Sequence, residues 1–174
     1  MSDYEALFID VLSGHHNDSK WDAAIFSGIK TISNTKVGSV GQDFIERLCE
    51  KLGVAISFPV STENKRLSQS PWDLEINGVK FELKTATEDV SGSFQFNHIR
   101  YHRKYEALMC LGVSPNKLYF NIWSKADVTT GKAGSLVSME KSGNASYKLT
   151  KKPSQLHEID LFGVHVDNFT RHFK

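Results

Sequence analysis

The chain has 174 residues and a formal net charge of +1 at pH 7, with 40% hydrophobic and 24% charged residues. This balance is ordinary for a soluble globular protein, and the length suits a single domain over residues 1–174 with a sizeable core. No apolar run is long enough to span a membrane, and the first residues lack the layout of a signal peptide, so we expect a cytoplasmic protein without a membrane partner.

The two cysteines, Cys49 and Cys110, lie far apart and belong to no CxxC motif. We therefore expect two reduced thiols and no structural zinc site. Basic side chains gather locally, in residues 98–104 and again in residues 148–152. A nearly neutral protein can bind DNA through such patches, because the phosphate contribution depends on the local contacts and not on the total charge.

Two amphipathic helices are predicted in the first third of the chain. Residues 3–12 place apolar side chains along one helical stripe. Residues 39–52 do so more strongly, and Gly53 supplies the stop after a stripe that consists of Phe44, Ile45, Leu48, Cys49 and Leu52. Residues 22–32 are ambiguous, with a short helix as one interpretation, whereas residues 54–58 are predicted to form a strand.

Residues 71–86 have the pattern of a β-hairpin. Asn77-Gly78 separates two alternating runs, and both residues of a type I′ turn need a positive φ. This turn fixes the register, which pairs Ile76 with Val79, Glu75 with Lys80, Leu74 with Phe81, and Asp73 with Glu82. Because side chains alternate along a strand, the core face is predicted to hold Trp72, Leu74, Ile76, Val79, Phe81 and Leu83.

The opposite face of the hairpin carries Asp73, Glu75, Lys80, Glu82 and Lys84. Glu75 and Lys80 form an ordinary pair of opposite charges, but Asp73 opposite Glu82 is destabilising unless a cation lies between the carboxylates. Mg²⁺ suits this position, since it takes one or two carboxylates and keeps water at its other positions. Lys84 shares the face and can reach a metal-bound water or a phosphate. The face is therefore a candidate site for phosphodiester cleavage.

These residues resemble the motif of the PD-(D/E)xK nuclease superfamily. The match consists of Pro71, Asp73 and the Glu82-Leu83-Lys84 run, with Trp72 inserted between the usual proline and aspartate. The resemblance covers residues 38–124. It implies an α/β, restriction-endonuclease-like fold, with a central mixed sheet of about five strands flanked by helices on both faces. It also implies the Leu83 carbonyl as a further ligand to Mg²⁺.

The same resemblance assigns further residues to the site. A glutamate on the helix over residues 39–52 often completes the metal site, and Glu46 occupies that position; a surface charge is an equally good interpretation of Glu46. A helix is expected after the second catalytic strand. There, Gln95, Asn97, His98 and Arg100 could contact phosphates or base edges of DNA. The alternative is a polar helix face, and Arg103 is assigned to the surface.

The rest of the chain supplies structure more than chemistry. Residues 105–113 and 117–124 are nearly continuous apolar runs, which predict strands buried in the middle of the sheet, joined by a turn. Residues 146–149 are predicted to form a short strand, and residues 166–173 a closing helix.

The implied function is a Mg²⁺-dependent endonuclease that hydrolyses double-stranded DNA, most similar to a sequence-specific type II restriction endonuclease. Cutting both strands of a palindrome calls for two sites related by a two-fold axis, so we expect a homodimer, with residues 4–12 and 166–173 as candidate contact surfaces. Two alternatives stay open. One is a nuclease selective for junctions or damaged DNA, and the other is an inactive DNA-binding module with the same fold.

Overall fold

The computed structural model describes residues 3–14, 18–67, 70–139 and 146–173. The helices, apart from short 3₁₀ turns, are α1 (Asp3–Gly14), α2 (Asn34–Leu52), α3 (Lys125–Thr129) and α4 (Phe162–His172). The strands are β1 (Ile56–Ser57), β2 (Leu74–Ile76), β3 (Val79–Thr87), β4 (Phe94–Ile99), β5 (Ala107–Val113), β6 (Leu118–Ser124), β7 (Leu136–Ser138), β8 (Tyr147–Lys151) and β9 (His157–Glu158). In this part of the chain, no helix is long and apolar enough to cross a membrane.

The architecture is α/β around a central mixed sheet, as predicted. Six strands form this sheet in the order β1-β2-β3-β5-β6-β9, and β3 and β5 are its parallel neighbours. A second sheet of three strands has the order β4-β8-β7. All seven residues of β5 are buried, which confirms the interior strand that the apolar run predicted. β6 is only half-buried, since just the two-residue β9 pairs with its outer edge.

The predicted hairpin forms with the predicted register between β2 and β3. Leu74 pairs with Phe81, Glu75 with Lys80, and Ile76 with Val79. Asn77 and Gly78 have φ values of 50° and 83°, as a type I′ turn requires. The register therefore follows from two turn residues.

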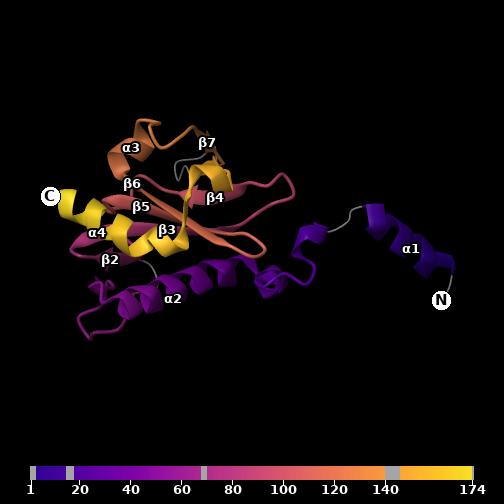
Figure 1. Cartoon of the computed structure of the whole chain (residues 1–174), viewed down its shortest axis with the longest axis horizontal. Coiled ribbons are helices and arrows are strands. Elements are labelled where there is room, and N and C mark those ends of the chain that lie inside the picture. The colour runs from indigo at the N-terminus through magenta and orange to yellow at the C-terminus, as the bar shows by residue number, and fades with distance from the viewer. Residues whose placement is uncertain (1–2, 15–17, 68–69, 140–145, 174) are drawn as a thin grey trace.

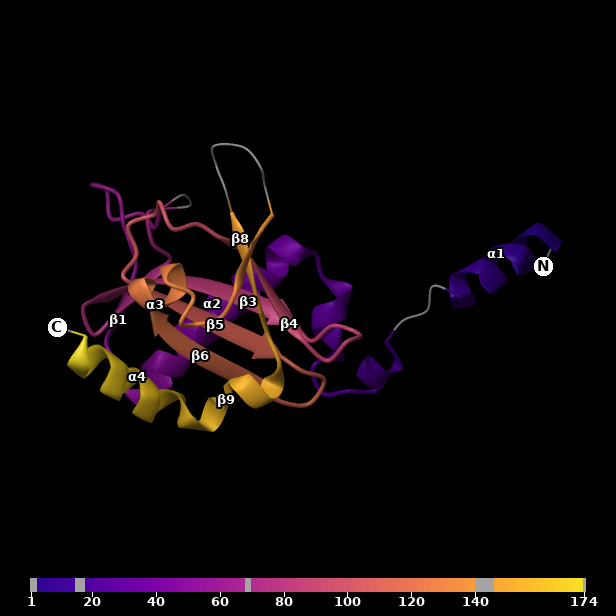
Figure 2. The same ribbon diagram turned by 90° about the horizontal axis from the view of Figure 1, so that it is seen from above.

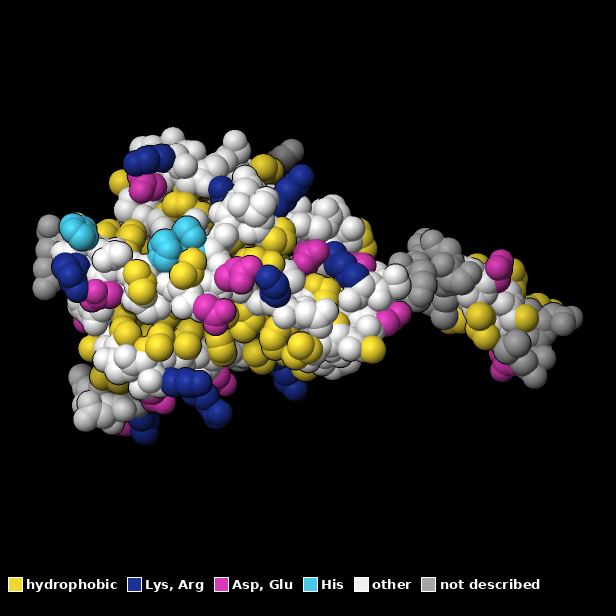
Figure 3. All heavy atoms as spheres, viewed as in Figure 1, with side chains coloured by type: hydrophobic (Ala, Val, Ile, Leu, Met, Phe, Trp, Pro, Cys, Tyr) yellow, Lys and Arg dark blue, Asp and Glu magenta, His cyan; other side chains and the backbone are white. Residues whose placement is uncertain are grey.

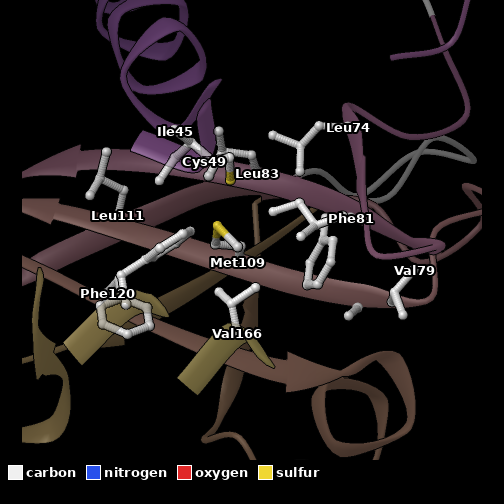
Figure 4. Packing of buried hydrophobic residues seen from close by; sticks show 13 residues of the cluster. Ile45, Cys49, Leu74, Val79, Phe81, Leu83, Met109, Leu111, Phe120 and Val166 are labelled. Carbon is white, nitrogen blue, oxygen red and sulfur yellow. The ribbon is translucent and has the colours of Figure 1, made fainter. Parts of the chain in front are cut away.

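Helices cover one face of the central sheet, whereas the other face is covered largely by the second sheet (Figures 1 and 2). On the first face, Ile45 and Cys49 of α2 and Val166 of α4 pack against Met109 and Phe81 of the sheet (Figure 4). On the second face, buried side chains of β4, β8 and α3 pack against Ala86, Leu108 and Cys110. Each face thus buries its own hydrophobic cluster, and the short α3 is the helix on the second face.

Residues 94–99 form strand β4, so the helix expected there is wrong. Phe94, Phe96 and Ile99 are all fully buried, although Ile99 is out of step with strict alternation. A register shift between Phe96 and Ile99 and a φ of 57° at His98 show the reason, which is a β-bulge. The extra residue returns Ile99 to the core and leaves Asn97 and His98 exposed.

Trp72 is not on the core face of the hairpin, contrary to the prediction. It precedes β2, and its ring is half-buried and lies 4.4 Å from Lys80 Nζ, a side chain of the polar face. The Asp73 amide donates to the carbonyl of Phe81, although Phe81 is also the residue paired with Leu74. The regular alternation of side chains along β2 therefore ends before Asp73. The regular pairing of Asp73 with Glu82 is therefore absent, and only the side chains of these residues can meet.

Helix α2 holds the site by a close approach to β3. Ser33 caps its first turn by accepting from the amide of Lys36, and Gly53 ends it in the left-handed conformation. Gly41 allows α2 to lie directly on β3, since a Cβ there would be only 1.9 Å from Oγ1 of Thr85. The next residue along the helix, Gln42, is consequently placed beside the start of the hairpin.

Candidate active site

Three of the predicted catalytic residues come together at the hairpin. Glu82 and Lys84 project from β3, and Lys84 Nζ lies 2.6 Å from Glu82 Oε1. The Glu82 side chain is fully buried, while Lys84 and Asp73 keep 19% and 28% of their side chains exposed. A deeply placed carboxylate thus has a more accessible carboxylate and a lysine at its edge.

Asp73 is fixed by three hydrogen bonds that involve both its backbone and its carboxylate. Its Oδ2 accepts from the amide of Leu83 at 2.8 Å, and its amide donates to the carbonyl of Phe81 at 2.8 Å. Its carbonyl accepts from Nε2 of Gln42 at 3.3 Å. Asp73 is therefore oriented toward β3 although it lies outside strand β2. The Leu83 side chain faces the core, and the role of its carbonyl stays a prediction.

The pKa of Asp73 is raised above its ordinary value. Burial is the largest cause, and the charge of Glu82 is the second. The Leu83 amide, Lys84 and Arg103 oppose the shift without cancelling it. Burial is thus the main cause of the raised pKa, and Lys84 and Arg103 bring two positive charges to the two carboxylates.

Arg103 belongs to the site, although the sequence analysis assigned it to the surface. Its Nη1 lies 3.2 Å from Glu82 Oε2 and 3.9 Å from Asp73 Oδ1, so one guanidinium contacts both carboxylates. Its own carbonyl accepts from Nζ of Lys125 in the first turn of α3. Arg103 lies in the loop before β5, which pairs with β3, and this pairing returns the loop to Glu82. No local pattern in the sequence indicates this pairing, so the sequence did not identify Arg103 as a residue of the site.

One oxygen of the buried carboxylate has an ionic partner but no hydrogen bond of regular geometry. Glu82 Oε1 lies 2.6 Å from Lys84 Nζ, and among the described residues no group donates to it in hydrogen-bond geometry. Within the described ranges, no three His, Cys, Asp or Glu side chains are close enough to share a metal ion. Two carboxylates fit Mg²⁺, which completes its shell with water.

Glu46 is not brought to the carboxylate pair. Its Oε2 lies 3.4 Å from Nη1 of Arg66, and both side chains are partly exposed. The α2 residue that reaches Asp73 is Gln42, one turn earlier on the helix. Gln42 carries no charge, whereas the family resemblance points to a glutamate on this helix.

A hollow of about 380 Å³ opens beside Asp73. Its wall combines residues of α2, of the loop before the hairpin and of the loop before β5, including Ser39, Gln42, Arg66, Trp72, Asp73 and Arg103. The hollow therefore leads from solvent to Asp73, and its wall carries two arginines together with Asp43 and Asp73. An anionic substrate that enters it can contact the two guanidinium groups.

Three of the four predicted DNA-binding residues line a second hollow, of about 350 Å³, which begins at Thr85 of β3. Asn97 and His98 are exposed on the β4 bulge, and Thr85 and Thr87 of β3 lie in the same wall. Gln95 lines it too, but its amide donates to Oδ2 of Asp89 at 3.0 Å. Arg100 lies outside this wall, half-buried, with its buried Nε donating to no described residue. Lys84 immediately precedes Thr85 on β3, so the second hollow lies next to the candidate site along this strand.

Comparison with known proteins gives little independent information about this arrangement. A scan against protein-family models finds no match, and no curated protein is significantly similar in sequence. A solved structure of the bacterial homing endonuclease I-Ssp6803I aligns with 82% of this chain and 99% of its own, at 10% identity and a TM-score of 0.46. At this level of similarity, any assignment of function has to come from the site itself.

Proposed function

We propose that this protein is a Mg²⁺-dependent endonuclease that hydrolyses phosphodiester bonds in double-stranded DNA, in the manner of a type II restriction endonuclease. The observation that carries the proposal is the fully buried Glu82 carboxylate, which is paired with Lys84 and Arg103 and has a second carboxylate, Asp73, beside it. A hollow beside Asp73 and a second one that begins at Thr85 of β3 give DNA two places to contact the protein near the site.

Asp73 and Glu82 are the residues that would hold the metal, with the Leu83 carbonyl as a further ligand. When bound there, Mg²⁺ would polarise the scissile phosphate and lower the pKa of a bound water. Lys84 orients the attacking water and stabilises the negative charge that accumulates on the phosphate oxygens. Water adds to phosphorus as the P–O3′ bond breaks, so the products are a 5′-phosphate and a 3′-hydroxyl.

Arg103 has a separate role in this scheme. It supplies one positive charge to two carboxylates, which limits their repulsion while leaving Asp73 partly exposed. Its guanidinium also lines the hollow beside Asp73. A planar, permanently charged group in this position suits contact with a phosphate of the bound strand. Asn97 and His98, which are exposed on the bulge of β4, are assigned to contacts with the DNA.

The class of DNA that is cut separates this proposal from its nearest alternative. The purified protein with Mg²⁺ is expected to convert a long unmethylated linear duplex into discrete fragments, because a sequence-specific enzyme cuts at fixed positions. A four-way junction of unrelated sequence, assayed in parallel, is expected to remain intact. Rapid cleavage of the junction with an intact linear duplex would instead assign the site to a structure-selective nuclease.

A further inference from the structure

Helix α1 exposes an apolar stripe. Tyr4, Leu7, Phe8 and Val11 recur at the spacing i, i+3, i+4 and i+7, and Tyr4 and Phe8 are 84% and 63% exposed. The helix lies apart from the sheet in both ribbon views (Figures 1 and 2). An isolated helix of 12 residues is marginal in water, and its stability comes from burial of such a stripe. The stripe therefore calls for a partner surface.

The body of the molecule has an apolar groove of matching character. This groove has a volume of about 460 Å³, and its lining includes Ile25, Ile29, Val40, Phe44, Leu111 and Leu118. Leu111 belongs to the cluster beneath α2 and α4, so the groove continues the sheet face that these helices cover. In the space-filling view, hydrophobic side chains form a band across this side of the molecule (Figure 3). The groove has room for a few apolar side chains of a further helix.

The charges of the two surfaces are complementary. Helix α1 contains Asp3, Glu5 and Asp10 and no basic residue. Lys30 follows Ile29, a residue of the groove, although its Nζ is directed to the Trp21 ring and to Thr87. Lys36 lies one turn before Val40 on α2, hence on the same side of that helix as this groove residue. Helix α1 is thus acidic, and a lysine lies near the groove on α2. The match would favour α1 over a basic or uncharged apolar segment.

The connection between α1 and the body of the molecule bears on whether α1 docks into the groove of its own chain or into that of a second copy. Lys20 Nζ lies 2.9 Å from Asp18 Oδ2 and 3.0 Å from Glu88 Oε1, and Trp21 Nε1 donates to the carbonyl of Glu88. Residues 18–21 are therefore tied to the end of β3, and α1 continues outward from them (Figure 2). Three residues join α1 to this anchor, and a short connection of this kind favours exchange of an element between copies.

We propose that α1 of one copy docks into the apolar groove of a second copy, and that the reciprocal contact makes a two-fold symmetric dimer. Aromatic side chains bury about 150–250 Å² each. The two Tyr4 and two Phe8 rings, together with the groove surface that they cover, reach the roughly 1,200–2,000 Å² of a specific interface. The other candidate surface, α4, is used within the chain, since Val166 and Phe169 pack into the core.

The proposal is independent of nuclease activity and is tested by light scattering on the full chain. The wild type is expected at twice its mass of 19.6 kDa. Phe8→Glu on α1 and Val40→Glu in the groove should each raise the dissociation constant on the order of 30-fold or more. Val164→Glu, at a residue of α4 that is 64% exposed, is the matched control and should remain dimeric. A monomeric wild type would overturn the proposal.

Disulfide trapping then identifies the copy that supplies α1. The native Cys49 and Cys110 are buried, so they do not compete with introduced thiols. A mixture of the Phe8→Cys and Val40→Cys proteins is expected to give, on mild oxidation, a covalent dimer that contains one chain of each kind. A chain that carries both substitutions and closes a disulfide only within itself, at micromolar concentration, would show that α1 folds onto its own groove.

Discussion

Lys84→Ala is expected to reduce the rate of DNA cleavage by about 10²–10³-fold, which is the usual effect of removing one group that stabilises charge in a transition state. Its ammonium is the cationic group at 2.6 Å from Glu82 Oε1, where the attacking water and the phosphate would meet. The variant should keep its fold, because Arg103 still pairs with Glu82. Single-turnover cleavage separates this loss of rate from any change in DNA affinity.

Lys80→Ala is the matched control for this experiment. Lys80 lies on the same strand and the same face as Lys84, two residues before Glu82 instead of two residues after it. Its Nζ lies over the ring of Trp72, and it forms no ion pair with Asp73 or Glu82, so the variant loses the same charge and leaves the ionic partners of both carboxylates in place. If Lys84→Ala and Lys80→Ala cleave DNA at the same rate, Lys84 has no specific role in the reaction.

Asp73→Asn is expected to abolish cleavage and at the same time to raise the free energy of unfolding at neutral pH. The folded-state pKa of Asp73 is raised by burial and by Glu82. A carboxyl group with a raised pKa stabilises the fold fully below its unfolded pKa, near 3.9, and loses that contribution as the pH rises through the folded pKa. At neutral pH the charged Asp73 therefore destabilises the fold relative to a neutral side chain of the same shape.

Urea unfolding of Asp73→Asn and wild type over a range of pH tests this expectation. The stability of the variant should exceed that of the wild type at pH 7, and the difference should shrink toward acid. Glu82→Gln is the opposite control: this fully buried carboxylate pairs with Lys84 and Arg103, so its neutralisation should lower stability. Equal destabilisation by both substitutions would mean that the charged form of Asp73 stabilises the fold, which contradicts this expectation.

Local patterns were sufficient for much of the fold. Asn77-Gly78 predicted the turn and thereby three correct pairs of the hairpin, because only a type I′ geometry places positive φ at both residues. The apolar stripe around Ile45 and Cys49 predicted the buried side of α2, and Gly53 its end. The continuous apolar run of β5 predicted an interior strand. Each of these signals acts over a few residues of sequence.

The parts that the sequence did not reveal depend on long-range pairing or on a break in periodicity. A helix was expected at residues 94–99 from the family resemblance, whereas this segment is strand β4, in which the bulge at His98 moves Ile99 onto the face of Phe96. At the site, the facing charges of the hairpin pointed to Asp73, Glu82 and Lys84, which the structure brings together. Arg103 reaches them only through the parallel pairing of β3 with β5, which no local pattern specifies.

Cleavage of supercoiled plasmid under three metal conditions tests the central claim most directly. With Mg²⁺ the wild type is expected to linearise or fragment the plasmid, and the Asp73→Asn protein to leave it intact. With EDTA neither protein should cut. With Ca²⁺ the wild type should bind the plasmid but cut little, since the looser coordination of Ca²⁺ positions water poorly. Full activity of the wild type in EDTA, or equal activity of Asp73→Asn in Mg²⁺, would contradict the assignment.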